Sequence, residues 1–242
     1  MSMILVYGPS GSGKSRAMIN LDPKSTGIIC SDSKELPFKG WKKNYITEYE
    51  IVEVLDGKSG QMIKTKRIAL SKSNYLQTKK PASILKALQE WNERPEIKTV
   101  VWDTMTHAIM YRFMTDPKVD WDFYKILARE IYEILNYIQK MTTKDVIVIG
   151  HADVKLDASG TKIDAVRTIG KLLDEKVEIP SMFTIVLTTS ITRDPEEKTN
   201  SYQFVTQSDG SSFGKSPEGM FEELNIPNDY NYVLQKIHEY YG

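Results

Sequence analysis

The sequence has little of several features that mark common classes of protein. Cys30 is the only cysteine among 242 residues, which excludes a disulfide within the chain and a zinc site built from four thiolates. Cys30 ends an apolar run, so we expect a small buried side chain rather than a reactive thiol. No apolar run approaches the roughly 20 residues of a membrane-spanning helix, and the first residues lack a signal-peptide pattern. We therefore expect a cytoplasmic protein that does not cross a membrane.

Net charge is also absent, because 32 basic residues balance 32 acidic ones. The chain has no overall field that would attract nucleic acid or an anionic membrane, so any contact with DNA must use a local basic patch. Arginine is scarce after residue 16, and the remaining arginines are scattered. They are Arg67, Arg94, Arg112, Arg129, Arg167 and Arg193. This pattern disfavours a kinase that clusters positive charge over a transferring phosphate.

One motif is present without a mismatch. Gly8–Ser15 reads G-P-S-G-S-G-K-S and fits the phosphate-binding pattern G-x-x-x-x-G-K-[ST]. The apolar run Met3–Tyr7 precedes it as a strand, and Arg16–Ile19 can open a helix, which is the context that the motif requires. The residues expected to contact a nucleotide are Gly8, Pro9, Ser10, Gly11, Ser12, Gly13, Lys14, Ser15 and Arg16. The motif therefore predicts that the chain binds a nucleoside triphosphate.

Each position of this loop has a chemical reason. Gly8, Gly11 and Gly13 allow positive φ angles and a close approach of backbone N–H groups to phosphate. The following helix would add the partial positive charge of its N-terminus. We expect Lys14 to reach the β- and γ-phosphates and the Ser15 hydroxyl to ligate Mg²⁺.

The remaining pattern predicts one α/β domain over residues 1–242. Apolar segments at 26–30, 99–103, 145–150 and 182–187 read as buried strands, and helical spacing covers 81–93, 121–141 and 229–240. This alternation predicts a mainly parallel, doubly wound sheet. A surface hairpin is inserted at about 45–75, and a second hairpin joins 185–191 to 201–206. Residues 152–181 look polar and irregular.

Two residues at strand ends could complete a nucleotide site. Asp103 follows four apolar or β-branched residues, as expected for the carboxylate that holds Mg²⁺ beside a phosphate loop; the alternative is a turn or helix cap. His151 directly follows the strand at 145–150 and could sense the γ-phosphate, or it could cap a neighbouring backbone group. His107 and His238 have no partner in the sequence pattern, so we expect structural roles for both.

The carboxylate that orients the attacking water is less clearly marked. Asp32 and Glu35 both follow the strand at 26–30, where a general base could lie. We favour Asp32, because Glu35 lies further into the loop. Solvated loop carboxylates are the alternative for both.

Three motifs together resemble a known group of proteins. The segments G-P-S-G-S-G-K-S, V-V-W-D-T-M-T-H and V-I-V-I-G-H resemble phage nucleotide-binding proteins with a RecA-like core, including the Sak-four-type single-strand annealing proteins placed among AAA-like ATPases. The resemblance implies an Mg²⁺-dependent ATPase that forms rings or filaments and handles single-stranded DNA. It makes Gly8–Ser15 the Walker A loop, Asp103 the Walker B acid and His151 a polar sensor. It also implies a basic residue from a neighbouring subunit, for which Lys215 is the candidate, with a solvated loop lysine as the alternative.

Two segments could contact DNA under this resemblance. The segment 152–177 corresponds in place to the DNA-contacting loops, but it contains equal numbers of basic and acidic residues. The basic residues are Lys155, Lys162, Arg167, Lys171 and Lys176, and the acidic ones are Asp153, Asp157, Asp164, Asp174 and Glu175. A more basic stretch could track a single strand, or it could be a solvated hairpin face. It contains Lys58, Lys64, Lys66, Arg67, Tyr75, Lys72, Lys79 and Lys80.

Two other functions use the same phosphate loop. One is a nucleoside or nucleotide kinase, and the other is a binding module that nucleotide switches between states. The choice of ATP as the cofactor comes from the resemblance alone, since no residue in the sequence can be shown to read the base.

Overall fold

The computed structural model describes residues 1–57, 60–156, 162–169, 177–193, 196, 199–208, 210 and 212–242. Its centre is a sheet with the strand order β11-β10-β9-β1-β7-β6-β2-β5, in which β8 pairs with β7. The strands are β1 (Met3–Gly8), β2 (Thr26–Cys30), β5 (Tyr75–Gln77), β6 (Thr99–Asp103), β7 (Asp145–Leu156), β8 (Lys162–Val166), β9 (Ile185–Arg193), β10 (Asn200–Val205) and β11 (Asn225–Pro227). Every pairing from β9 across to β5 is parallel. The expected mainly parallel α/β sheet is confirmed.

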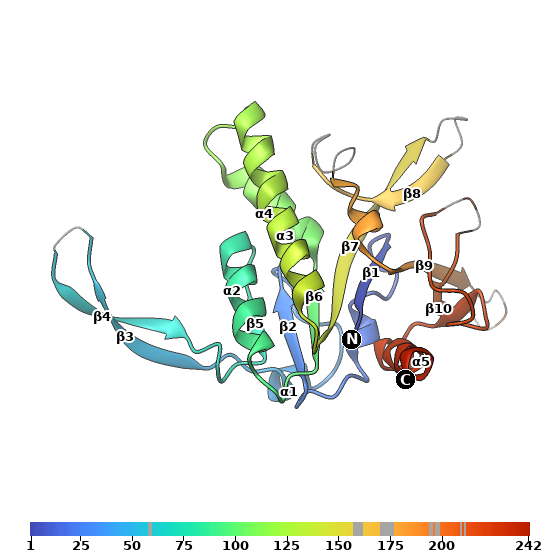
Figure 1. Ribbon diagram of the computed structural model, residues 1–242, viewed down its shortest axis with the longest axis horizontal. Coiled ribbons are helices and arrows are strands. Elements are labelled where there is room, and N and C mark those ends of the chain that lie inside the picture. Colours follow the sequence, from blue (N-terminus) through green and yellow to red (C-terminus); the bar gives the residue numbers. More distant parts are fainter. Residues whose placement is uncertain are drawn as a thin grey trace.

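Helices cover both faces of this sheet (Figure 1). One face carries α2 (Pro81–Asn92), α3 (Met105–Thr115) and α4 (Trp121–Lys140), and the other carries α5 (Tyr230–Tyr241) and a 3₁₀ helix at Arg16–Met18. Strand β1 shows why both faces need cover: Leu5 and Tyr7 enter the core under α2–α4, whereas Ile4 and Val6 enter the core under α5. All four side chains are fully buried, as expected for a strand between two apolar layers.

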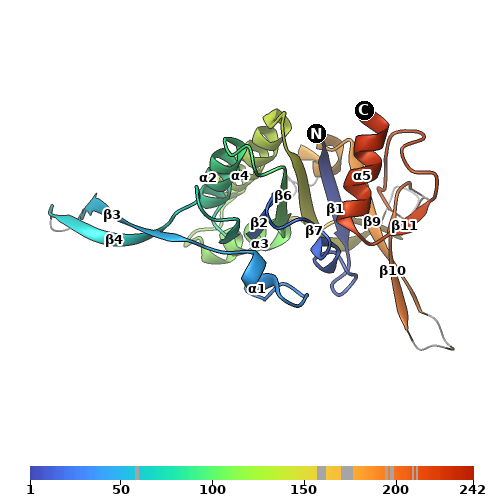
Figure 2. The ribbon, with the colours of Figure 1, turned by 90° about the horizontal axis from the view of Figure 1, so that it is seen from below.

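The inserted hairpin is confirmed and forms an arm. Strands β3 (Tyr49–Leu55) and β4 (Met62–Ile68) pair only with each other as an antiparallel ribbon among the described residues. The ribbon projects away from the sheet, and Figure 2 shows the same extension from a second direction. Before the arm, α1 (Trp41–Asn44) makes one short turn, and after it β5 returns to pair with β2.

Several local expectations were wrong. Within the described segment 1–57, no α-helix lies between the phosphate loop and β2. A three-residue 3₁₀ helix stands there instead, because β2 begins at Thr26 and Pro23 interrupts the short connection. Strand β7 runs past His151 to Leu156 and pairs antiparallel with β8, so part of 152–181 is regular. Strand β9 begins at Ile185 rather than at residue 182.

Two further features did not follow from the apolar pattern. Helix α3 begins at once after β6, where the Thr104 hydroxyl accepts a hydrogen bond from the His107 backbone N–H at 3.3 Å. His238, expected to lack a partner, has its Nε2 2.7 Å from Asp145 Oδ2. This contact ties α5 to the start of β7, at the sheet edge opposite the phosphate loop.

Gly27 is predicted to be essential for packing between β2 and α2. A Cβ at this position would lie 2.5 Å from Cε3 of the fully buried Trp91. We expect Gly27→Ala to lower the free energy of unfolding by about 1–3 kcal/mol through overpacking. Urea denaturation measures the effect. Gly57→Ala is the control, since nothing lies within 4 Å of its added Cβ, and it should change stability by less than about 0.5 kcal/mol. Equal effects of the two substitutions would contradict this account.

Candidate nucleotide-binding site

Strand register brings the sequence-predicted residues to one edge of the sheet. Gly8 lies beside His151, Asp103 beside Ile149, and Cys30 beside Asp103. A cavity of about 450 Å³ opens at this edge. Its lining comprises Ser10, Gly11, Ser12, Gly13, Lys14, Ser15, Arg16, Cys30, Asp32, Lys34, Glu35, Leu36, Pro37, Asp103, Thr104, His151 and Tyr202. Ligand sites of open α/β sheets lie at this carboxyl edge.

The glycines of the phosphate loop serve two different purposes. Gly11 and Gly13 have φ angles of 78° and 90°, which disfavour any residue with a Cβ. Gly8 does not adopt a positive φ, contrary to the expectation from the motif. It is required for close packing instead, because its Cβ would lie 1.8 Å from Thr189 Oγ1. The Thr189 hydroxyl donates to Ser12 Oγ at 2.8 Å, so β9 holds the loop from the side.

The loop presents unpaired backbone donors. Among the described residues, no acceptor receives a hydrogen bond from the backbone N–H groups of residues 10–15. Successive N–H groups of this kind form an anion-binding concavity. The Ala17 N–H does bond to Gly13 O at 3.0 Å, which closes one turn after the loop. A single turn supplies a smaller axial dipole than the helix that the sequence suggested, so the loop amides carry more of the attraction for phosphate.

Lys14 is buried against the same loop. Its Nζ donates to Gly8 O at 2.8 Å and to Pro9 O at 2.6 Å. Burial lowers the pKa of Lys14 to about 8, although the nearby Asp103 carboxylate acts to raise it. The ammonium is therefore held within the cavity by weak neutral acceptors. Phosphate oxygens are stronger acceptors for an ammonium than carbonyl oxygens are, so Lys14 can exchange its partners when a nucleotide binds.

Asp103 lies beside Ser15 at the base of the cavity. Burial raises the pKa of Asp103 to about 6, while a hydrogen bond from Ser15 and the charge of Lys14 act to lower it. A carboxylate and a hydroxyl in contact supply the hard oxygen ligands that Mg²⁺ prefers, with water and phosphate oxygens filling its other positions. The described residues contain no group of three or more His, Cys, Asp or Glu side chains that could hold a metal alone. The donor set fits a magnesium ion that arrives with nucleotide phosphates.

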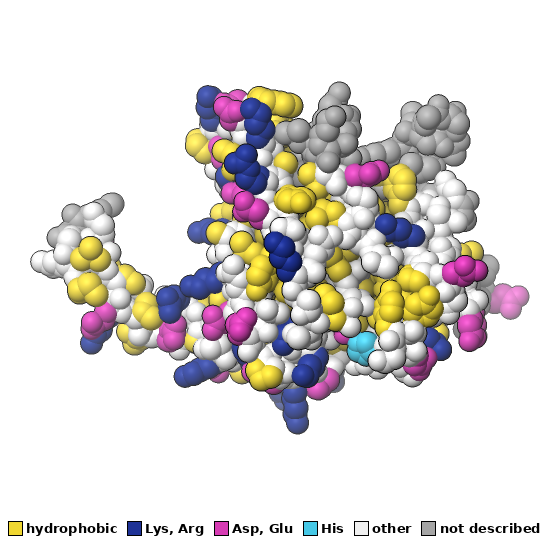
Figure 3. Space-filling view, viewed as in Figure 1, with side chains coloured by type: hydrophobic (Ala, Val, Ile, Leu, Met, Phe, Trp, Pro, Cys, Tyr) yellow, Lys and Arg dark blue, Asp and Glu magenta, His cyan; other side chains and the backbone are white. Residues whose placement is uncertain are grey.

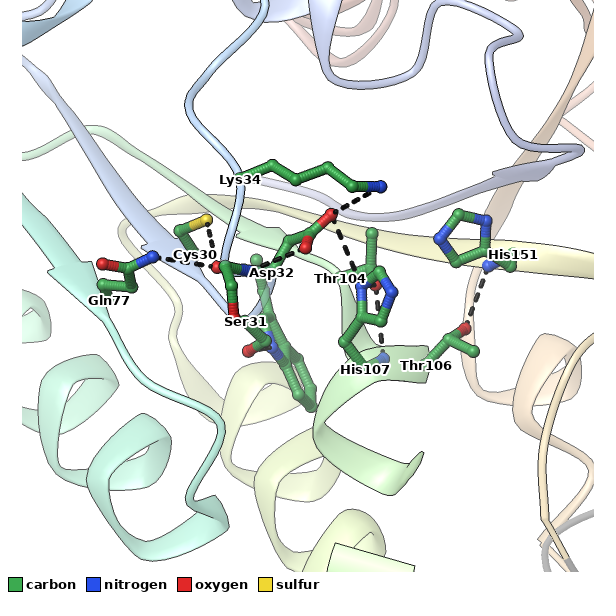
Figure 4. Close-up of polar contacts among 11 residues, drawn as sticks. Cys30, Ser31, Asp32, Lys34, Gln77, Thr104, Thr106, His107 and His151 are labelled. Atoms are coloured by element: carbon green, nitrogen blue, oxygen red, sulfur yellow. Dashed lines mark hydrogen bonds and ion pairs between the residues drawn. The ribbon is translucent and has the colours of Figure 1, made fainter. Parts of the chain in front are cut away.

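Asp32 and Glu35 both line the cavity, but their surroundings differ. Asp32 Oδ2 lies 3.6 Å from Lys34 Nζ and 3.9 Å from His107 Nδ1 (Figure 4). Glu35 is exposed and forms an ion pair with Lys42 outside the cavity. This geometry favours Asp32 for contact with a reacting water. Lys34, which sequence reasoning missed, brings a second ammonium into the cavity.

Two histidine rings lie beside Asp32. The rings of His107 and His151 meet edge to face, with centroids 5.1 Å apart, and His107 Nδ1 lies 3.0 Å from Thr104 Oγ1. Burial, together with the charge of Lys14, lowers the pKa of His151 to about 4, and burial also lowers the pKa of His107. Both rings are therefore neutral at pH 7. His107 was expected to lack a partner; its position three residues after Thr104, on the first turn of α3, was the signal that could have placed it here.

Other predicted residues lie outside the cavity. Lys215 is half-buried, and its backbone pairs with Val186 near the start of β9 through bonds of 2.8 and 2.9 Å. Tyr75 is buried against Trp41, so its ring cannot stack on a base as the sequence suggested. Lys64, Lys66 and Arg67 stand on the arm. Lys58, Asp157, Lys171, Asp174, Glu175 and Lys176 lie outside the described residues, as do the side chains of Lys155 and Lys162.

Asp103 is predicted to reduce the stability of the nucleotide-free protein. The folded chain keeps this proton up to about pH 6, whereas the unfolded chain releases it near pH 3.8. The Asp103 contribution to the free energy of unfolding therefore falls as the pH rises between these values and stays low above them. We expect Asp103→Asn to be more stable by about 1–3 kcal/mol at pH 7.5, measured by urea denaturation from pH 4 to 8.

The difference between variant and wild type isolates Asp103 in this experiment. His151, whose pKa is lowered, acts in the opposite direction over part of the same pH range. A less stable Asp103→Asn protein at pH 7.5 would show that attraction to Lys14 outweighs the cost of burying the carboxylate.

Comparisons with known proteins identify the family of this chain. No match was found among curated proteins. The structure is similar to the flagellar accessory protein FlaH from Methanocaldococcus jannaschii, with 13% sequence identity, a TM-score of 0.45, and coverage of 93% of this chain and 83% of that one. No helix among the described residues is long and apolar enough to span a membrane. The family model described as "AAA domain" matches residues 2–217. Since this match covers most of the chain, including the phosphate loop, the chain belongs to the AAA domain family and is an AAA-type P-loop ATPase.

Proposed function

We propose that this protein binds ATP with Mg²⁺ in the cavity at the phosphate loop and hydrolyses the γ-phosphate. One observation carries the proposal: the unpaired loop amides, Lys14, the Ser15–Asp103 pair and Asp32 all line the same 450 Å³ cavity. Phosphoryl transfer needs mainly positioning and charge neutralisation. Mg²⁺, when bound through Ser15 and Asp103, neutralises charge on the phosphate oxygens.

Asp32 is the proposed base that orients the attacking water. Its carboxylate is partly exposed to the cavity, and Lys34 and His107 lie on different sides of it. The neutral His151 ring lies next to His107 at the same edge. A neutral imidazole can donate one hydrogen bond and accept another, so His151 can contact the γ-phosphate or its water without adding a charge.

A neighbouring subunit is proposed to complete the site. Lys14 and Lys34 are the lysines that line the cavity, and no arginine other than the exposed Arg16 lines it among the described residues. A basic side chain supplied in trans would add charge at the transferring phosphoryl group only after assembly into a ring or filament. Lys215 remains the proposed residue for this role.

Single-stranded DNA is the proposed partner of the assembly, in phage recombination or replication. The exposed face of the arm supports this proposal, because Lys66 Nζ lies 4.0 Å from the ring centroid of the exposed Tyr49. Figure 3 shows hydrophobic and basic side chains along the same arm. Aromatic rings that stack on bases, next to cations, are typical of single-strand binding. Arg67 and Lys64 are paired with Glu50 and Glu53, so the electrostatic attraction is modest.

A kinase function is the second candidate because a further cavity opens beside Glu35. It has a volume of about 530 Å³, shares Glu35, Leu36 and Pro37 with the nucleotide cavity, and includes Trp41, Lys42 and Lys43. A phosphate acceptor or a neighbour's side chain could enter there. If added nucleosides become phosphorylated by ATP, the kinase replaces the hydrolase; the nucleotide-switched binding module remains if neither reaction occurs.

Asp32 and Glu35 give a matched test of the hydrolase. We expect Asp32→Asn to lower kcat by about 10²–10⁴-fold, the usual contribution of a positioned base, with little change in the Kd of ATP. Glu35→Gln makes the same change in charge on the same loop and should keep kcat within about threefold. Lys14→Ala should lose ATP binding, so its rate of phosphate release gives the background of the assay. Turnover is measured as phosphate release with Mg²⁺; equal loss in the Asp32 and Glu35 variants would remove Asp32 from this role.

DNA coupling is tested by measuring ATP turnover with a single-stranded oligonucleotide. We expect stimulation that declines between about 50 and 200 mM salt, because cation–phosphate contacts are salt-sensitive. The double variant Tyr49→Ala/Lys66→Ala should lose most of the stimulation and keep the basal rate. The control is Trp121→Ala/Lys125→Ala, which removes a similar exposed ring–cation pair at the start of α4. Unchanged stimulation in the arm variant would show that DNA does not contact the arm.

A further inference from the structure

Two cavities adjoin the one at the phosphate loop, and they lie on different sides of it. The first, of about 580 Å³, shares Arg16 and Tyr202 with the nucleotide cavity. The second is the 530 Å³ cavity that shares Glu35, Leu36 and Pro37. Each of these two cavities offers room for a nucleoside attached to phosphates on the loop.

The reacting groups decide between the two directions. Asp103, Asp32 and His151 are the proposed neighbours of the γ-phosphate. Asp32 precedes Glu35 on the same loop, and Glu35 lines both the nucleotide cavity and the second cavity. A triphosphate that presents its γ end there must direct its nucleoside the opposite way, past Arg16 and Tyr202. The nucleoside therefore enters the 580 Å³ cavity. This step rests on the proposed function, because it uses the roles given to Asp103 and Asp32.

Asn228 lines that cavity and lies directly against the phosphate loop. A Cβ built on Gly13 would lie 2.7 Å from Asn228 Oδ1 and 3.2 Å from Tyr202 Cδ1. Both polar atoms of the Asn228 side chain are buried, and neither has a hydrogen-bond partner among the described residues. Buried polar groups in proteins are nearly always paired. An unpaired carboxamide, adjacent to a nucleotide loop, indicates a partner that comes from the ligand.

We propose that Asn228, Tyr202 and Arg16 form the subsite for the nucleotide base, and that the Asn228 carboxamide selects adenine over guanine. A carboxamide offers one acceptor and one donor in a plane, which match the N6 amino group of adenine and its neighbouring ring nitrogen. Guanine presents two acceptors on the corresponding edge, so the carboxamide oxygen would meet another acceptor. Tyr202 provides a ring face for stacking, and the exposed Arg16 guanidinium covers the base from the loop side.

Base selection is measured as the ratio of the Kd of GTP to the Kd of ATP, with Mg²⁺ present. We expect the wild type to favour ATP by about tenfold or more, the discrimination typical of a paired donor and acceptor. In Asn228→Leu, where an apolar side chain of similar size pairs with neither base, this ratio should fall to about 1. Asn225→Leu is the matched control, because it makes the same substitution in the same cavity and should leave the ratio unchanged. Tyr202→Leu should weaken ATP and GTP equally, whereas Tyr202→Phe should not.

Inorganic tripolyphosphate separates failure of this subsite from failure of the proposed function. The wild type, Asn228→Leu and Tyr202→Leu should bind tripolyphosphate with Mg²⁺ equally well, because the base subsite does not touch the phosphates. If Asn228→Leu loses tripolyphosphate binding, it is misfolded, and the Asn228→Ala variant is measured instead, with the same expected ratio of about 1.

Three results would overturn the subsite: a wild type without preference for ATP, an unchanged ratio in the Asn228 variant that still binds tripolyphosphate, or an equal change in Asn225→Leu. A wild type that binds neither nucleotide nor tripolyphosphate would instead overturn the proposed function.

Discussion

The burial of two opposite charges, Lys14 and Asp103, is the constraint on which the nucleotide cavity depends. The sheet beneath them is apolar on both faces, so charged side chains can stand only where the strands end. Register places the ends of β1 and β6 together, and the loop amides, Ser15 and Asp32 gather around the pair. Burial raises the pKa of Asp103 and lowers that of Lys14, which means that burial destabilises the charged form of each group when no ligand is bound. Phosphate would stabilise the charged Lys14 and a divalent cation the charged Asp103, because each ligand brings the opposite charge.

The cavity is held from three sides by residues far apart in the sequence. Thr189 from β9 bonds to Ser12 in the loop, and its contact with Gly8 leaves no room for a Cβ. Asn228, after β11, packs on Gly13. His107 from α3 lies between Asp32 and His151. The antiparallel strands at the end of the sheet therefore support the nucleoside side of the loop, while α3 supports the side where the γ-phosphate is proposed to react.

Local sequence predicted well those features that depend on a short run of residues. The strands around the phosphate loop, the strand that ends at Asp103, helices α2 and α4, and the β3–β4 arm follow from apolar periodicity and turn residues. Prediction failed where a distant contact decides the outcome. The 3₁₀ turn after the loop reflects the short connection to β2, and β8 exists because β7 offers it an open edge. Tyr75 was expected to be available for DNA, but pairing of β5 with β2 buries its ring.

The sequence by itself determined the fold class, the phosphate loop and the identity of the carboxylates beside it, because each depends on residue types at fixed spacing along the chain. Only the tertiary structure decided which side chains join them. Lys34 and Tyr202 carry no local signal for a nucleotide site, and they reach it through strand register and the pairing of β10 with β9. The same is true of Asn228, because only the pairing of β11 with β10 brings its unpaired carboxamide against the phosphate loop. A motif specifies contacts made by consecutive residues, whereas the rest of a site is specified by which strands become neighbours.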